Sequence, residues 1–166
     1  MGEEKFMWKA LPQRKSPRWK GYDYTHSGAY FVTICAYKRL HVFGEIHDGE
    51  MIHNRVGEIV IEQWFSLVDH YQGIDLDAFI VMPNHVHGIV ILPDAADESA
   101  VSLSGVVGTY KSGVTRRVRV ALDDAEFRVW QTSFHDHVIR NEASLNRIRE
   151  YVANNPARWA EDTFYG

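Results

Sequence analysis

The sequence predicts an α+β fold of the ferredoxin-like type, an antiparallel sheet with helices on one face, followed by a C-terminal helix that carries a tyrosine. Two observations lead to this prediction. Segments with strand composition and segments with helical periodicity follow one another in the order strand, helix, strand, strand, helix, strand, and a last helix comes after them. The chain has 166 residues, of which 45% are hydrophobic, and this suits the core of one compact domain.

Residues 1–20 form a predicted N-terminal arm, and residues 21–166 form the predicted domain. The arm combines basic residues with Trp8 and Trp19 and has no regular hydrophobic period. No apolar stretch approaches the length of about 20 residues that crosses a bilayer, and the start of the chain lacks the hydrophobic segment of a signal peptide. We therefore expect a cytoplasmic protein with no membrane partner. The single cysteine, Cys35, lies in an apolar run and is expected to be a small buried side chain rather than a nucleophile.

The first half of the domain contains three predicted strands and one helix. Residues 29–37 (AYFVTICAY) are rich in aromatic and β-branched residues and are expected to form the first strand. Asn54 is a candidate N-cap for a helix that runs to about residue 70, because apolar residues recur on one face of it. Two short strands, 78–82 and 85–92, follow. A turn with proline and asparagine joins them into a hairpin.

The second half begins with a polar loop, 94–100, and a helix over residues 102–120 whose three glycines weaken the prediction that it is continuous. Residues 127–131 (FRVWQ) are expected to form the fourth strand. The last helix, 142–154, is the clearest, because it follows the N-cap candidate Asn141 and ends before a proline.

The strand predicted at 85–92 contains two histidines, His85 and His87, in an otherwise apolar run. Side chains alternate between the faces of a strand, so both imidazoles point the same way. Each neutral imidazole offers one nitrogen to a metal ion, and two on one face can share an ion. The alternative is a pair of buried histidines that are hydrogen-bonded to their neighbours, and the residues alone leave both readings open.

A third and a fourth polar group lie on the last helix, where Tyr151 and Asn155 are four residues apart and therefore share a face. An asparagine amide oxygen is a ligand for hard cations. A tyrosine at the edge of an apolar stripe is usually a packing residue, and a phenol with a pKa of about 10 is a poor nucleophile unless a neighbouring group activates the reaction. A second His-x-His pair, His135 and His137, competes with the first pair as the metal site.

Six segments, in order and spacing, resemble the REP-associated tyrosine transposases, where REP stands for repetitive extragenic palindrome. These proteins are relatives of the single-tyrosine HUH transposases of insertion sequences. The resemblance covers residues 14–162 and is carried by RKSPRWKGYDYTHSGAYFVTICAYKR, FGEI, MPNHVHGIVIL, GTYKSGVTR, VWQTSFHDHVIRNE and IREYVANNPARWAED. Tyr110 stands where the family is expected to have a phenylalanine or a similar residue, and it is a poor rival nucleophile.

The resemblance implies roles for the residues that match the family's motifs. His85 and His87 are the implied metal ligands, Asn155 takes the place of a third ligand, and Tyr151 is the implied nucleophile. The implied cofactor is a divalent ion, Mg²⁺ or Mn²⁺, although two imidazoles and an amide oxygen favour Mn²⁺ or Zn²⁺ by ligand preference. The implied reaction links the tyrosine to a 5′-phosphate of single-stranded DNA that folds into palindromic hairpins, and leaves a 3′-hydroxyl.

Basic residues indicate where such DNA would bind, although the net charge of −4 shows no overall basic balance. The candidates in the arm and in the long helix are Arg14, Lys15, Arg18, Lys20, Lys111, Arg116 and Arg117. His137, Arg140 and Asn141 are further candidates for contacts to DNA or for support of the site, with packing and capping as the alternatives. The plain alternatives are a loose terminal arm and ordinary solvated charge.

Two other functions remain open from the sequence. The protein could bind DNA hairpins without cleaving them, or it could be a metal-dependent hydrolase in which water attacks in place of the tyrosine. HExxH, Walker and CxxC motifs are absent from the sequence, so it gives no support to other enzyme classes. A monomer is favoured over a dimer, and the expected location is the cytoplasm, in association with the nucleoid when DNA is bound.

Overall fold

The computed structural model describes residues 28–93 and 101–162. The predicted arm and its four candidate DNA-binding residues, Arg14, Lys15, Arg18 and Lys20, lie outside the described residues, and so does the predicted loop 94–100.

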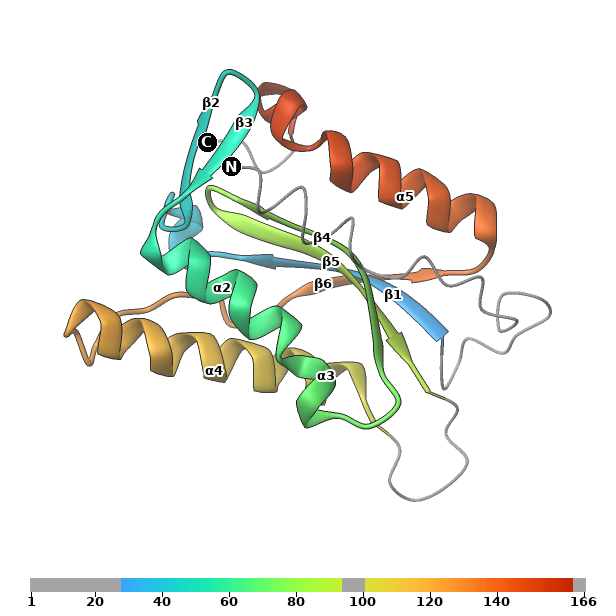
Figure 1. Ribbon diagram of the computed structural model, residues 1–166, viewed down its shortest axis with the longest axis horizontal. Helices are drawn as coiled ribbons and strands as arrows, with labels where there is room; N and C mark the ends of the chain where they lie inside the picture. Colours follow the sequence, from blue (N-terminus) through green and yellow to red (C-terminus); the bar gives the residue numbers. More distant parts are fainter. Residues whose placement is uncertain (1–27, 94–100, 163–166) are drawn as a thin grey trace.

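Four antiparallel strands form the central sheet in the order β4-β5-β1-β6 (Figure 1). They are β1 (Gly28–Cys35), β4 (Asp75–Met82), β5 (His85–Leu92) and β6 (His135–Ile139). Counted among these four along the chain, the order is second, third, first, fourth, which is the order of a ferredoxin-like β-α-β-β-α-β unit. The predicted α+β fold is therefore confirmed, and β5 begins and ends at the predicted residues.

One face of the sheet is covered by two long helices that lie side by side (Figure 1). These are α2 (Arg55–Phe65), which continues into the short α3 (Leu67–His70), and α4 (Leu103–Leu122). The indole of Trp64 stacks on Phe79 with ring centroids 4.5 Å apart. Gly88 of β5 faces the same indole, because a Cβ on Gly88 would lie 2.5 Å from Trp64. Packing against the aromatic layer therefore requires a glycine immediately after the histidine pair.

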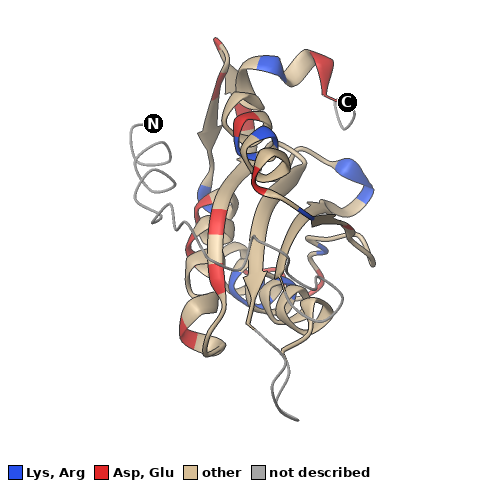
Figure 2. Ribbon diagram, turned by 90° about the vertical axis from the view of Figure 1, so that its right-hand side faces the viewer, with Lys and Arg blue, Asp and Glu red and all other residues tan. Residues whose placement is uncertain are grey.

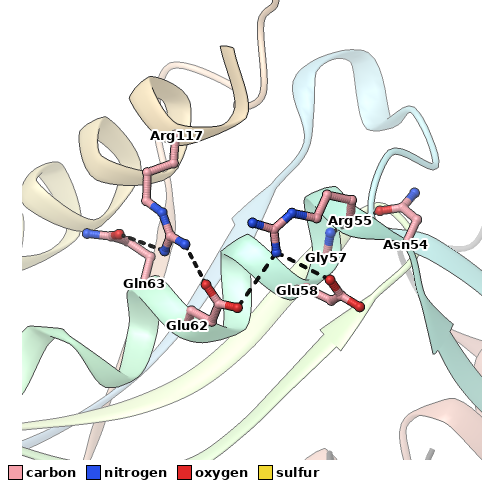
Figure 3. A network of polar contacts seen from close by, with 7 residues as sticks. All are labelled: Asn54, Arg55, Gly57, Glu58, Glu62, Gln63 and Arg117. Atoms are coloured by element: carbon pink, nitrogen blue, oxygen red, sulfur yellow. Dashed lines mark hydrogen bonds and ion pairs between the residues drawn. The ribbon is translucent and has the colours of Figure 1, made fainter. Parts of the chain in front are cut away.

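Polar contacts join α2 and α4 at their exposed edges (Figure 3). Asn54 accepts a hydrogen bond from the Gly57 backbone N–H at 2.9 Å, which confirms the predicted N-cap. Arg117 of α4 pairs with Glu62 and donates to Gln63 of α2. The glycines of α4 do not break the helix, and one of them is needed for packing. A Cβ at Gly113 would lie 2.3 Å from the amide of Gln63.

The opposite face of the sheet is covered by α5 (Glu142–Asn154) (Figure 1). Asn141 caps α5 by accepting from the Ser144 backbone N–H at 2.8 Å, as predicted. The apolar stripe of α5, Leu145 and Val152, packs on a second cluster that includes Ile80 and Ile89. A short 3-10 helix, η3 (Pro156–Glu161), follows α5, and a second one, η2 (Tyr37–Arg39), follows β1.

The prediction of the fourth strand at 127–131 is wrong. That segment makes only an isolated bridge, Ala36 to Trp130, and the fourth strand is β6, His135–Ile139. The apolar residues Val129 and Trp130 are buried without being part of a strand, whereas the first three residues of β6 are exposed on a sheet edge. The apolar composition of 127–131 therefore suggested a strand at the wrong segment. In this fold the buried residues there are not the ones that pair with the sheet.

A two-stranded hairpin of β2 (Gly44–His47) and β3 (Glu50–His53) was not predicted. Its turn residues, Asp48 and Gly49, both have positive φ, 51° and 76°. This is the turn in which Asp-Gly is preferred, so the dipeptide was a usable signal. Within the described ranges, the structure contains no helix that is long and apolar enough to cross a membrane.

Candidate metal and tyrosine site

The two histidines of β5 point toward α5 from adjacent positions on one face of the sheet, as the strand period predicts. His85 and His87 are 0% and 1% exposed, so neither side chain is solvated by bulk water. Their Nε2 atoms lie 3.1 Å apart. The two imidazoles therefore direct their Nε2 atoms to the same position.

The other nitrogen of each imidazole is held by a neighbouring side chain. His85 Nδ1 lies 2.7 Å from Asn84 Oδ1, and His87 Nδ1 lies 2.8 Å from Thr33 Oγ1. An amide oxygen can only accept, so Nδ1–H of His85 is the donor and its Nε2 carries a lone pair. The Thr33 hydroxyl can donate to His87 or accept from it. Histidines that bind metals in proteins are oriented in this way by hydrogen bonds at their second nitrogen.

Burial keeps both histidines neutral at physiological pH. It lowers the pKa of His85 to about 4, with Asp162 and Asn155 nearby acting in the opposite direction. The pKa of His87 is lowered well below its ordinary value, by burial first and by the neighbouring His85 second. A neutral imidazole is the form that binds a cation, so the site does not have to lose a proton to ligate one at pH 7.

Asn155 is the C-cap residue of α5 and is 3% exposed. Its Oδ1 atom is buried and makes no hydrogen bond with the described residues. An unsatisfied buried acceptor is costly, and a cation beside it would remove that cost. The predicted third ligand therefore lies beside the histidines with an oxygen that fits an ion.

A carboxylate that the sequence analysis did not select completes the group. The side chain of Asp162, after η3, is fully buried, and its Oδ2 lies 3.7 Å from His85 Nε2. His85, His87 and Asp162 offer ligand atoms within 4.8 Å of one another, and no other such group is found in residues 28–93 and 101–162. Asp162 comes after the end of a helix with no periodic relation to it, so the sequence held no signal for this contact.

Tyr151 lies against the histidine pair from α5. Its ring meets His87 edge to face with centroids 5.4 Å apart, and Phe31, which stacks on His87 at 5.1 Å, borders it on the side of β1. The tyrosine is 44% exposed and lines a cleft of about 570 Å³ together with Asn155 and Asp162. A polymeric substrate can therefore reach the phenol, while the histidines behind it stay dry.

The phenol is not activated by the protein alone. Burial raises the pKa of Tyr151, and so does the negative charge of Asp162, whereas Asn155 lowers it. The hydroxyl is therefore protonated at neutral pH, and a nucleophilic role requires a group that lowers the barrier at the electrophile. Tyr110, the other tyrosine considered from the sequence, is fully buried and donates to the Val60 carbonyl.

The second His-x-His pair does not join this group. The register pairs His135 with Thr33 and His137 with Phe31, so both histidines lie on the same sheet face as the first pair, on the edge strand β6. Both are exposed. Arg140 is exposed next to them, and Asn141 is occupied as the helix cap.

The three basic residues predicted on α4 differ in their surroundings. Lys111 Nζ donates to the Gln131 carbonyl at 2.7 Å, and burial lowers its pKa. Arg117 is paired with Glu62 across the helix interface (Figure 3). Arg116 is exposed and makes no hydrogen bond or ion pair with the described residues.

Two proteins of Haemophilus influenzae are similar to this chain in sequence. A Haemophilus influenzae protein without a described function is 31% identical over 172 residues, which cover 93% of this chain and 94% of that protein. A candidate REP-associated tyrosine transposase of the same organism is 22% identical over 82% of this chain and 74% of its own length.

Two solved structures share the fold. A REP-associated tyrosine transposase bound to a REP hairpin superposes with a TM-score of 0.61 at 20% identity, over 82% of this chain and 71% of that one. A candidate transposase from Deinococcus radiodurans has a TM-score of 0.51 at 20% identity, over 81% of this chain and 95% of that one. Residues 24–155 match the family described as IS200-like transposases. The chain therefore belongs to the IS200-like transposase family, and the prediction of a transposase is confirmed.

Proposed function

We propose that this transposase cuts and joins single-stranded DNA next to palindromic hairpins through a covalent link to Tyr151. One observation carries the proposal, namely that the exposed phenol of Tyr151 lies against His87, a buried, neutral imidazole whose Nε2 atom is 3.1 Å from that of His85. The similarity to a transposase bound to a REP hairpin supports a hairpin substrate.

His85 and His87 would hold a divalent ion, with Asn155 Oδ1 and the Asp162 carboxylate as oxygen ligands. Two imidazoles, an amide and a carboxylate fit Mn²⁺ and also Mg²⁺, and the carboxylate adds the hard oxygen that the predicted ligand set lacked. The bound ion would supply Lewis acidity at the phosphodiester and offset charge in the transition state.

The protein's own residues perform the covalent step. The Tyr151 oxygen forms a bond to phosphorus as the bond from phosphorus to the 3′ oxygen breaks, the phenol loses its proton, and the leaving oxygen takes one up as a 3′-hydroxyl. The number of phosphoester bonds is conserved, so another 3′-hydroxyl can reverse the step and join strands. Asn84 and Thr33 orient the two imidazoles through hydrogen bonds with their Nδ1 atoms. Phe31, a residue of β1, packs against Tyr151 and His87.

The test mixes the full-length protein with a hairpin oligonucleotide that has single-stranded flanks, in the presence of Mn²⁺. Two labels, one at each end of the DNA, report which fragment stays attached after denaturation. We expect an adduct that carries only the 3′ fragment. Tyr151→Phe and His85→Ala should abolish it, and Tyr71→Phe, which removes a hydroxyl bonded to Gly105 on the other side of the sheet, should preserve it.

Two outcomes would replace the proposal. Cleavage that survives Tyr151→Phe without an adduct would indicate a metal-dependent hydrolase that uses water. Tight binding of hairpins with no cleavage would indicate a DNA-binding protein that has lost strand transfer.

A further inference from the structure

A basic groove runs between α4 and residues 125–132, on the sheet face opposite Tyr151. Its volume is about 800 Å³. Four cationic residues line it, and no carboxylate does. The cationic residues are Lys111, Arg116, Arg119 and Arg128. A concave surface with one sign of charge raises the local concentration of an oppositely charged ligand.

Three of the four cations are held in place by the protein. Lys111 Nζ donates to the Gln131 carbonyl at 2.7 Å, and Arg119 Nε donates to the Phe127 carbonyl at 3.0 Å. The Arg128 guanidinium lies over the Tyr37 ring, 4.4 Å from its centroid. These contacts use carbonyls and a ring, which leave the positive charges uncompensated and further N–H groups available.

The fourth cation is exposed and has no competing anion. Arg116 makes no hydrogen bond or ion pair with the described residues. Its neighbour Arg117 points away to α2, where Glu62 neutralises it (Figure 3). Over the rest of the described residues, acidic and basic residues are interspersed along the ribbon (Figure 2). The groove is therefore a local feature in a chain with a net charge of −4.

The chemistry of the groove fits phosphates better than bases. Trp130 lines it but is 8% exposed, and the ring of Tyr37 is covered by Arg128. Single-stranded DNA is usually bound by stacking its bases on exposed aromatic rings, and the lining residues provide no such ring. Contacts to the sugar-phosphate backbone of a duplex need only cations and donors.

One end of the groove lies near the catalytic face. Lys111 Nζ is 3.5 Å from the Ser133 carbonyl, just before β6 begins. His135 of β6 pairs with Thr33 of β1, which contacts His87. Two strand spacings, about 10 Å, therefore separate His135, two residues after Ser133, from His87. The acidic residues Asp123 and Asp124 lie at the other end, after α4, and would repel a polyanion there.

We propose that this groove binds the backbone of the duplex stem of the hairpin, so that the single-stranded foot of the stem passes the β6 edge to Tyr151. The inference rests on the proposed function for its substrate. The residues that contact the stem in this inference are Lys111, Arg116, Arg119 and Arg128. Arg117 has a structural role instead, through its pair with Glu62.

The test measures the affinity of the full-length protein for a fluorescent hairpin DNA as a function of salt. Each phosphate contact that is lost should lower the slope of log K against log salt by about 1. We expect Arg116→Gln and Arg128→Gln each to weaken binding and to lower the slope by about 1. Arg55→Gln is the matched control, an exposed arginine on α2 outside the groove, and it should leave the slope unchanged. Thermal unfolding checks that each variant is folded.

A second DNA separates the stem from the foot. On the same oligonucleotide with the stem strand scrambled so that it stays single-stranded, Arg116→Gln should bind as the wild type does. The inference is overturned if Arg116→Gln has the wild-type slope on the hairpin, or if its defect persists on the scrambled strand. Adduct formation by the wild type is scored separately, so a missing adduct refutes the proposed function while the salt slopes still decide the role of the groove.

Discussion

At the scale of residues, each imidazole of the candidate site is held by a neighbouring side chain, His85 by Asn84 and His87 by Thr33. The sequence was sufficient to place His85 and His87 on one face of a strand, because side chains alternate along it. It was insufficient for Thr33 and Asp162, because those contacts depend on strand register and on the path of the chain after α5. Such contacts are tertiary and leave no local pattern.

The hydrogen bond between Thr33 and His87 gives the first prediction. Thr33→Val keeps the shape of the buried side chain but removes the partner that orients His87. Loss of such a partner typically weakens metal binding by about 10- to 100-fold. We expect that loss in a calorimetric titration with Mn²⁺. Thr115→Val, which removes a hydroxyl bonded to Lys111 within α4, is the control and should bind Mn²⁺ as the wild type does. Equal affinity of the two variants would contradict the role of Thr33.

The buried histidines also make stability depend on pH. Their pKa values are lower in the folded chain than the ordinary value of 6.5, and for His85 the folded value is about 4. The unfolded chain therefore binds more protons below pH 6.5, and stability is lost as the pH falls from 6.5 toward 4. For His85 the loss is on the order of 3 kcal/mol.

Urea unfolding of the metal-free protein between pH 7 and pH 4 measures this loss. His85→Asn should show a smaller decrease over the same range, because it lacks the titrating group. Parallel curves for the wild type and His85→Asn would contradict the account of a histidine buried in its neutral form.

At the scale of elements, an ion pair holds the tyrosine helix on the sheet. Arg149 of α5 makes two hydrogen bonds to the Asp77 carboxylate of β4, at 2.7 and 2.6 Å, and both side chains are largely buried. Asp77 also accepts from the Ala78 backbone N–H. The sequence predicted α5 to the residue, because its cap and its apolar stripe are local. It could not predict this pair, because the two residues are 72 positions apart.

Breaking that pair should affect both stability and strand transfer. Arg149→Ala leaves the Asp77 carboxylate buried without its partner, and this typically costs about 3–5 kcal/mol. Because Tyr151 lies two residues further along α5, we also expect adduct formation to fall more than hairpin affinity does, under conditions where the variant is folded. Arg55→Ala, which breaks an exposed pair with Glu58, should cost less than about 1 kcal/mol. Similar urea midpoints for the two variants would contradict a structural role of the pair.

The wrong prediction of a strand at 127–131 belongs to the same scale. Val129 and Trp130 are apolar because they fill the core beside Tyr110, whereas β6 is polar because it is an edge strand with exposed side chains. Strand composition therefore indicates which residues are buried more reliably than it indicates which residues pair with another strand.

At the scale of the whole molecule, one chain supplies every part of the site. The histidines come from β5, and the tyrosine and the asparagine come from α5, which packs on the sheet of its own chain. We therefore predict that a monomer is competent. A mixture of His85→Ala and Tyr151→Phe proteins should form no adduct, because neither chain has a complete site. Restored adduct in the mixture would show that the tyrosine helix is exchanged between two copies.

The most direct test of the central claim locates the covalent bond. Trypsin digestion of the adduct formed with wild-type protein and Mn²⁺ should release the peptide EYVANNPAR, residues 150–158, whose only tyrosine is Tyr151. Mass spectrometry should find a nucleotide 5′-phosphate on that tyrosine. A nucleotide on any other peptide, or strand cleavage with this peptide unmodified, would contradict the assignment of Tyr151 as the nucleophile.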